Sequence, residues 1–81
     1  MPDWVVSADH RALVAALIAI RTEAGLTQRD MSARLGRSHS IIAKIETGQR
    51  NVSVLEFVAW CRVARVNPGS ALEALSLNSG G

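Results

Sequence analysis

The chain has 81 residues, of which 48% are hydrophobic and 20% charged, and its net charge is +2. From this length we expect one small domain with a single core and no second catalytic or ligand-sensing domain. The single cysteine, Cys61, excludes an internal disulfide and a cysteine-rich zinc site. We therefore expect Cys61 to be a small core residue, with no metal site and no cofactor.

Targeting signals are not evident. The start, MPDW, is not a basic run followed by a long apolar region, and the apolar run at 12–20 spans only nine residues. A membrane-spanning helix needs about 20. We expect a cytoplasmic protein that does not bind a membrane.

Residues 1–7 do not follow a helical pattern and are expected to form an N-terminal arm, in which Trp4 packs on the domain or on a partner. The first helix should follow, because Ser7 can cap it and Leu13, Leu17 and Ile20 recur at helical spacing before Gly25. His10, in its first turn, is expected at the surface.

Two short helices are predicted next. Thr27 can cap the first, with Asp30 three residues on, and Gly36 ends it. Ser38 can cap the second, which continues to Gly48. Neither helix could persist alone in water, so the two must pack on each other and on a scaffold. Two short helices joined by a tight turn containing glycine form a helix-turn-helix, whose second helix can enter the DNA major groove.

The rest of the chain predicts two more helices. Ser53 and Glu56 have capping-box spacing, so a helix should begin at Val54 and run to the break at Asn67-Pro68-Gly69, with Trp60 in the core or an interface. A last helix is expected from Ala71 to about Leu77. The prediction is an all-α fold of five helices, with a domain at 8–77 and a flexible tail at 78–81.

Polar side chains should face outward from the helix that follows Ser38. Ile42 and Ile45 lie three residues apart and form its inner face. Its remaining side chains point away from the core or lie at its edge: Ser38, His39, Ser40, Ile41 and Lys44. Hydroxyl, imidazole and ammonium groups can bond base edges, and an exposed isoleucine can touch a thymine methyl. The alternatives are an ordinary solvated face and a core position for Ile41.

Positive charge gathers in the same region. Between positions 29 and 50 there are five cations and two anions, in a chain whose total charge is only +2. Arg37 belongs to this group, and Arg50 and Asn51 follow in a loop from which they can reach backbone phosphates. We therefore predict that Arg37, Arg50 and Asn51 contact the DNA backbone.

The stretch GLTQRDMSARLGRSHSIIAKIETGQR resembles the helix-turn-helix of the Cro/CI-type family, the XRE-type regulators that include phage repressors. The resemblance covers about Arg21 to Arg50. Its recurring residues are Arg21, Gly25, Leu26, Thr27, Gln28, Leu35, Gly36, Ser38, Ile42, Lys44, Ile45, Glu46 and Gly48. It implies a five-helix, lambda-repressor-like domain that binds double-stranded DNA.

Roles for individual residues follow from this resemblance. It implies base contacts by His39, Ser40, Ile41 and Lys44. It also implies a phosphate contact by Gln28, which would brace the second helix, a capping and phosphate role for Ser38, and a structural ion pair of Arg21 with Glu46. Many members carry a longer residue, commonly Gln, at the position of His39, so the base preference is open.

Apolar residues near the C-terminus exceed what a short helix can bury. Because the last helix of the family commonly builds a twofold contact, Val66, Leu72 and Leu75 are predicted to join two subunits.

The leading hypothesis is a sequence-specific regulator, most plausibly a dimeric repressor on a palindromic operator. The alternative is an antitoxin or antirepressor-type protein that binds a toxin or antagonist protein through apolar surface around Trp4, Trp60 and the last helix. An enzyme is not expected, because no nucleophile, base and orienting group converge.

Overall fold

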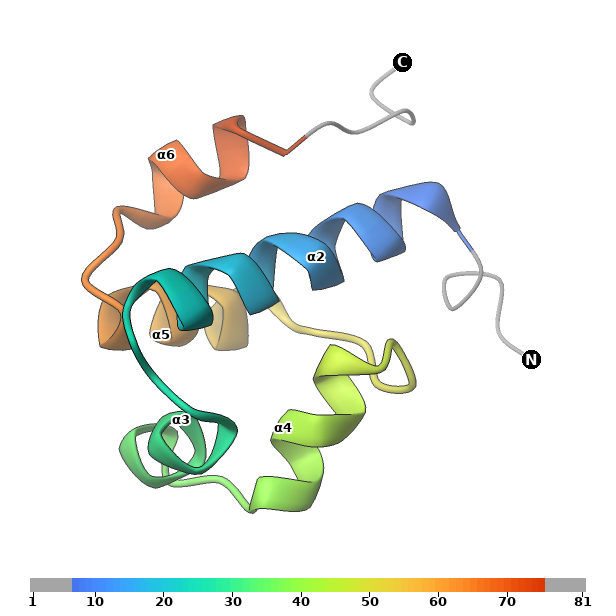
Figure 1. Cartoon of the computed structure of the whole chain (residues 1–81). Helices are drawn as coiled ribbons and strands as arrows, with labels where there is room; N and C mark the ends of the chain where they lie inside the picture. Colours follow the sequence, from blue (N-terminus) through green and yellow to red (C-terminus); the bar gives the residue numbers. More distant parts are fainter. Residues whose placement is uncertain (1–6, 76–81) are drawn as a thin grey trace.

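The computed structural model describes residues 7–75, and over this range the chain is all-helical with five helices and no strand. The helices are α2 (Ala8–Glu23), α3 (Gln28–Leu35), α4 (His39–Glu46), α5 (Val54–Val63) and α6 (Pro68–Glu73) (Figure 1). The predicted all-α, five-helix class is confirmed. The predicted arm, apart from Ser7, and the predicted tail lie outside the described residues. None of the described helices is long and apolar enough to cross a membrane.

The helices begin where side chains can cap them. Ser7 accepts the His10 N–H at the start of α2, and both predicted capping boxes are present, Thr27 with Asp30 and Ser53 with Glu56. These caps satisfy backbone N–H groups that have no partner inside a helix. Gly36 ends α3 with a left-handed φ of 66°, a conformation that costs glycine little. The chain can therefore turn sharply from α3 into α4.

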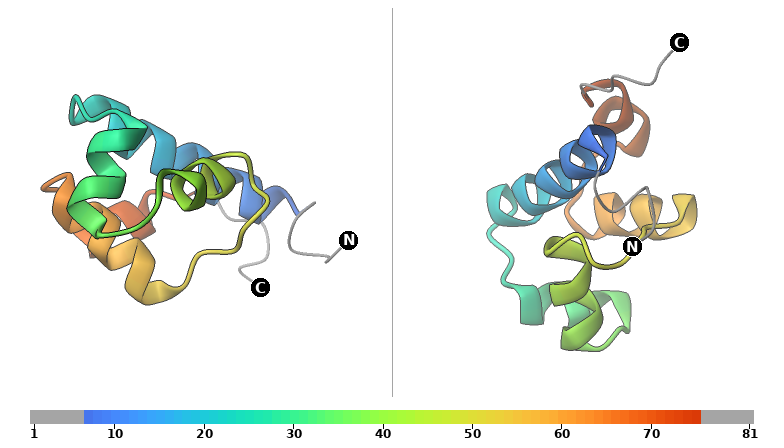
Figure 2. Two further views of the ribbon diagram at one scale, coloured as in Figure 1. Left: turned by 90° about the horizontal axis from the view of Figure 1, so that it is seen from below. Right: turned by 90° about the vertical axis from the view of Figure 1, so that its right-hand side faces the viewer.

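The helices pack in tiers. Helices α2 and α5 lie between α6 on one side and the α3–α4 pair on the other (Figures 1 and 2). The core lies among α2, α3, α4 and α5, and its residues are Leu17, Leu26, Met31, Ile42, Ile45, Phe57, Trp60 and Cys61. Trp60 is 1% exposed and donates its indole N–H to the Leu17 carbonyl at 3.0 Å. Burial raises the pKa of the Cys61 thiol, which agrees with the expected core role. The α3–α4 pair is thus held against a rigid base.

His10 is not at the surface, contrary to the sequence-based expectation. It is buried, and its Nε2 lies 3.2 Å from the carbonyl oxygen of Gly48, in the turn after α4. The imidazole therefore links the first turn of α2 to the end of α4. The expectation was wrong because its partner is 38 positions away in the chain.

The C-terminal helices also differ from prediction. Helix α5 ends at Val63, before the predicted break, and Arg65 takes a left-handed φ of 61°. Helix α6 begins at Pro68 and is capped by Asn67, so two residues predicted to break a helix start one instead. Proline is favourable in the first turn, because its missing N–H would have no helical partner there. Leu77, the predicted end of this helix, lies outside the described residues.

Candidate nucleic-acid interface

The orientation of α4 is set by its two isoleucines. Ile42 and Ile45 are 0% and 3% exposed and pack into the core, while Ser38 caps the helix by accepting the Ile41 N–H at 3.3 Å. Burying this face turns the opposite face outward. The start of α4 is consequently open to solvent.

Three of the four predicted base-contacting residues are on this outward face. His39, Ser40 and Lys44 are exposed, and within residues 7–75 Lys44 forms no ion pair. Ile41 differs, because it is half-buried and packs against the core. The molecule's own helices therefore leave an imidazole, a hydroxyl and an ammonium group uncovered. These groups can donate or accept hydrogen bonds at a base edge.

The α3 helix starts beside this face. Thr27 accepts the Asp30 N–H at 3.0 Å, and Asp30 accepts the Thr27 N–H at 2.9 Å. Hydrogen bonds from the backbone and side chain of Thr27 hold the pKa of the exposed Asp30 carboxyl below its usual value. The reciprocal cap fixes the first turn of α3 and thus the position of Gln28, its first residue.

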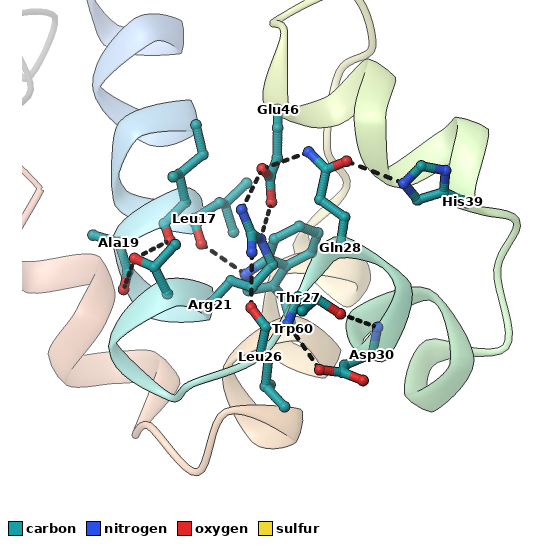
Figure 3. A network of polar contacts seen from close by, with 12 residues as sticks. Leu17, Ala19, Arg21, Leu26, Thr27, Gln28, Asp30, His39, Glu46 and Trp60 are labelled. Carbon is teal, nitrogen blue, oxygen red and sulfur yellow. Dashed lines mark hydrogen bonds and ion pairs between the residues drawn. The ribbon is translucent and has the colours of Figure 1, made fainter.

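A chain of polar contacts runs from α2 to the start of α4 (Figure 3). The Arg21 guanidinium donates to Glu46 through Nε at 2.6 Å and through Nη2 at 2.9 Å. The Gln28 Nε2 donates to Glu46 Oε1 at 3.0 Å, and the Gln28 Oε1 lies 3.2 Å from His39 Nε2. The hydrogen bond to Glu46 raises the pKa of Arg21, so this guanidinium stays charged. This chain of contacts therefore involves three helices and reaches one nitrogen of the His39 ring.

A second cluster joins two predicted phosphate-binding arginines to one carboxylate. Glu56 Oε2 accepts from Arg50 at 2.9 Å and from Arg37 at 3.2 Å, and Oε1 accepts the Ser53 N–H at 2.9 Å. Burial disfavours the charged carboxylate, but the Ser53 N–H and the arginines outweigh it, so the pKa of Glu56 is lowered. Glu56 is thus a negative group that partly neutralises both arginines.

The other predicted backbone contacts are exposed and lie at either end of α4. Ser38 precedes α4, and Asn51 lies in the loop between α4 and α5, where its Oδ1 accepts the Val52 N–H at 2.9 Å. Within residues 7–75 the side-chain amide nitrogen of Asn51 donates no hydrogen bond, so it is available as a donor. Polar donors are therefore present on both sides of the exposed α4 face.

The three residues predicted for a subunit contact line two surface pockets that share Leu75. Leu72 and Leu75 line an apolar surface pocket of about 350 Å³ together with Leu13 and Phe57. Val66 lines a second pocket, which Leu75 also lines, and is half-buried against the core. Leu72 is 55% exposed, which makes it the most accessible of the three.

Sequence reasoning missed the wider role of Glu56 and the link from Gln28 to Glu46. The sequence predicts only a helix-capping role for Glu56, although two arginine side chains and one backbone N–H donate to it. Several arginines near a carboxylate at a helix start could have indicated such a cluster. The sequence does not say, however, which arginine contacts that carboxylate in the folded chain. Among residues 7–75, no group of three His, Cys, Asp or Glu side chains could hold a metal ion.

Comparison with known proteins decides the family. The family model described as "Helix-turn-helix domain" matches residues 12–75, most of the chain. The chain belongs to this helix-turn-helix family. The helix-turn-helix is the α3–α4 pair, and the predicted family resemblance is confirmed.

A solved structure places this helix-turn-helix protein more narrowly. This chain is similar to the solved structure of an "XRE-family like protein from Pseudomonas syringae pv. tomato str. DC3000", with 38% sequence identity and a TM-score of 0.77. The match covers 82% of this chain and 80% of the other. No curated protein matches the chain. The XRE-type helix-turn-helix is a DNA-binding fold, so the exposed face of α4 is its candidate DNA surface.

Proposed function

We propose that this helix-turn-helix protein is a sequence-specific transcriptional regulator that binds double-stranded DNA as a dimeric repressor. Each subunit would insert α4 into the major groove, and two α4 helices would meet successive grooves about 34 Å apart on a palindromic operator. The observation that carries the proposal is the uncovered face of His39, Ser40 and Lys44 on a helix anchored by two buried isoleucines.

Base contact is assigned to His39, Ser40 and Lys44, with Ile41 at the edge of the contact because it is half-buried. Side chains near the start of a recognition helix reach base edges, and these three carry different hydrogen-bonding groups. Sequence discrimination would come from this set.

Backbone contact is assigned to the groups at either end of α4 and at the start of α3: Gln28, Arg37, Ser38, Arg50 and Asn51. Arg37 and Arg50 keep 45% and 34% of their side-chain surface exposed despite their bonds to Glu56. They can therefore turn toward phosphates, which would supply affinity without sequence preference. The Arg21–Glu46 pair is assigned a structural role.

The subunit contact is assigned to α6 and the pocket beside it. An exposed Leu72 next to the apolar wall of Leu13, Phe57 and Leu75 is surface that a second copy could bury. A twofold dimer would match the twofold symmetry of a palindromic site. Repression would act by occupancy of the operator, and the function is binding without a catalysed reaction.

The rival function, an antitoxin-type protein that binds a toxin or antagonist protein, has less support. It relied on apolar surface around Trp4, Trp60 and the last helix. Trp60 is 1% exposed and belongs to the core, and Trp4 lies outside the described residues. Among residues 7–75, the apolar surface beside α6 is the feature that supports this alternative.

Selection of bound sequences from a random DNA pool tests the proposed function directly. We expect enrichment of a palindrome with half-sites one helical turn apart. His39→Ala/Lys44→Ala should abolish the enrichment, while the matched surface variant Arg62→Ala should retain it. Failure to enrich any sequence, even at low salt, would refute the regulator assignment.

A further inference from the structure

The polar chain that ends at His39 determines which ring nitrogen carries the proton. It begins at Glu46, whose carboxylate is paired with the Arg21 guanidinium and offers only acceptor oxygens. Glu46 Oε1 accepts a hydrogen bond from Arg21 Nη2 and lies 3.0 Å from the side-chain amide of Gln28. Whichever Gln28 atom faces this oxygen must be a donor.

That requirement orients the Gln28 side chain. Its NH₂ group must face Glu46, because the reversed amide would bring two oxygens together with no proton between them. The carbonyl oxygen of Gln28 therefore faces His39, at 3.2 Å from Nε2. An ion pair on the scaffold thus dictates the polarity of a contact on the exposed face of α4.

The same logic applies to His39. Facing a carbonyl oxygen, its Nε2 must carry the hydrogen, and in a neutral imidazole the other nitrogen, Nδ1, is then an acceptor. Figure 3 shows that this second nitrogen is turned away from Gln28. Because the His39 side chain is exposed, Nδ1 can meet a group outside the protein.

We propose that His39 presents a hydrogen-bond acceptor to DNA and selects a base that offers an exocyclic amine, adenine N6 or cytosine N4. The inference rests on the proposed function and deepens it, because it names the base chemistry that this position reads. In the major groove these amines are the only base hydrogen-bond donors, whereas guanine N7 and O6 and thymine O4 accept. An imidazole held as an acceptor would face those acceptors unfavourably.

The first test needs no DNA. A two-bond ¹H–¹⁵N spectrum of the free protein, recorded at about pH 8, identifies the protonated ring nitrogen. We expect His39 to show the Nε2–H form, and Gln28→Ala to give a mixture. His10 is an internal control, because its Nε2 faces the Gly48 carbonyl and should be unchanged in the variant. An Nδ1–H form of His39, or no response to Gln28→Ala, would overturn the proposal.

The second test uses the selected operator. The base pair read by His39 is the one whose preference disappears in His39→Ala. Removing its exocyclic amine, with purine for adenine or 2-pyrimidinone for cytosine, should weaken binding of the wild-type protein about 3- to 10-fold and leave His39→Ala unaffected. Replacing the purine N7 by carbon should not weaken the wild-type protein through this contact.

The opposite pattern, loss on removal of N7 and none on removal of the amine, would overturn the inference and leave the regulator assignment intact. An absence of any selected sequence would instead overturn the proposed function. The two failures are therefore distinguishable.

Discussion

Arg21 and Glu46 form two hydrogen bonds that join α2 to the last residue of α4, at 2.6 and 2.9 Å. Their side chains keep only 12% and 5% of their surface exposed. Arg21 also donates to the carbonyl oxygen of Leu26, before α3, at 2.7 Å. One guanidinium thus connects α2 to the end of α4 and to the segment that leads into α3.

Replacing Arg21 with alanine should destabilise the fold more than it alters sequence preference. The change leaves the Glu46 carboxylate buried without its cation, which costs about 3–5 kcal/mol in free energy of unfolding. Urea denaturation followed by circular dichroism measures this loss. Arg62→Ala, on the exposed side of α5, removes the same charge and should cost less than about 0.5 kcal/mol. Equal losses would show that the ion pair contributes no special stability.

Local sequence signals predicted most of the helices because they act within a few residues. The pairs Thr27 with Asp30 and Ser53 with Glu56 satisfy backbone groups in the same turn, so spacing alone identifies them. The start of α6 was missed because Pro68 can either end one helix or begin the next, and the local sequence allows both. His10 was misplaced because its partner, Gly48, comes near only in the folded chain.

The candidate site shows the same division. The outward position of His39, Ser40 and Lys44 follows from the isoleucine spacing on α4, which is a property of one helix. The Gln28 contacts and the convergence of two arginines on Glu56 depend on how helices meet. Packing sets those distances, and packing is not encoded in any short stretch of sequence.

Lys44→Ala and Arg50→Ala should change DNA binding in different ways. Lys44 faces outward from α4, so its loss should lower discrimination between operator and random DNA, at a cost of about 1–3 kcal/mol on the operator. Arg50→Ala should weaken binding to operator and to random DNA by a similar factor. It should also reduce the slope of log affinity against log salt concentration by at most about 1. Fluorescence anisotropy on both DNAs over a range of salt concentrations measures each effect. If both variants changed the ratio of operator affinity to random-DNA affinity equally, the division into base and backbone contacts would be contradicted.

Glu56→Gln should tighten binding to any DNA and make it more sensitive to salt. The amide can still accept the Ser53 N–H, but the negative charge beside Arg37 and Arg50 is removed. Both arginines then interact fully with phosphates, and the salt slope should steepen by about 1. Glu73→Gln makes the same charge change on α6 and is the control. A matching increase in both variants would point to net charge instead of the local cluster.

Arg65→Gly should stabilise the protein. Arg65 follows the C-cap of α5 with a left-handed φ of 61°, which strains a residue that has a Cβ atom and suits glycine. The expected gain is about 0.5–1 kcal/mol in free energy of unfolding, measured by urea denaturation. Arg65→Ala removes the same charge but keeps the Cβ atom, so it should give no comparable gain. Equal stabilisation by both variants would indicate relief of charge repulsion.

Leu72→Lys should weaken dimer formation. Leu72 is 55% exposed beside the apolar pocket, and in a twofold dimer each substitution is present twice, so the dissociation constant should rise at least about tenfold. Sedimentation velocity over a concentration series measures the shift. Leu55→Lys changes a leucine that is 81% exposed on α5 and should leave the dimer unchanged. A wild-type protein that stays monomeric at high micromolar concentration, and that binds its operator without a second copy, would contradict the α6 contact.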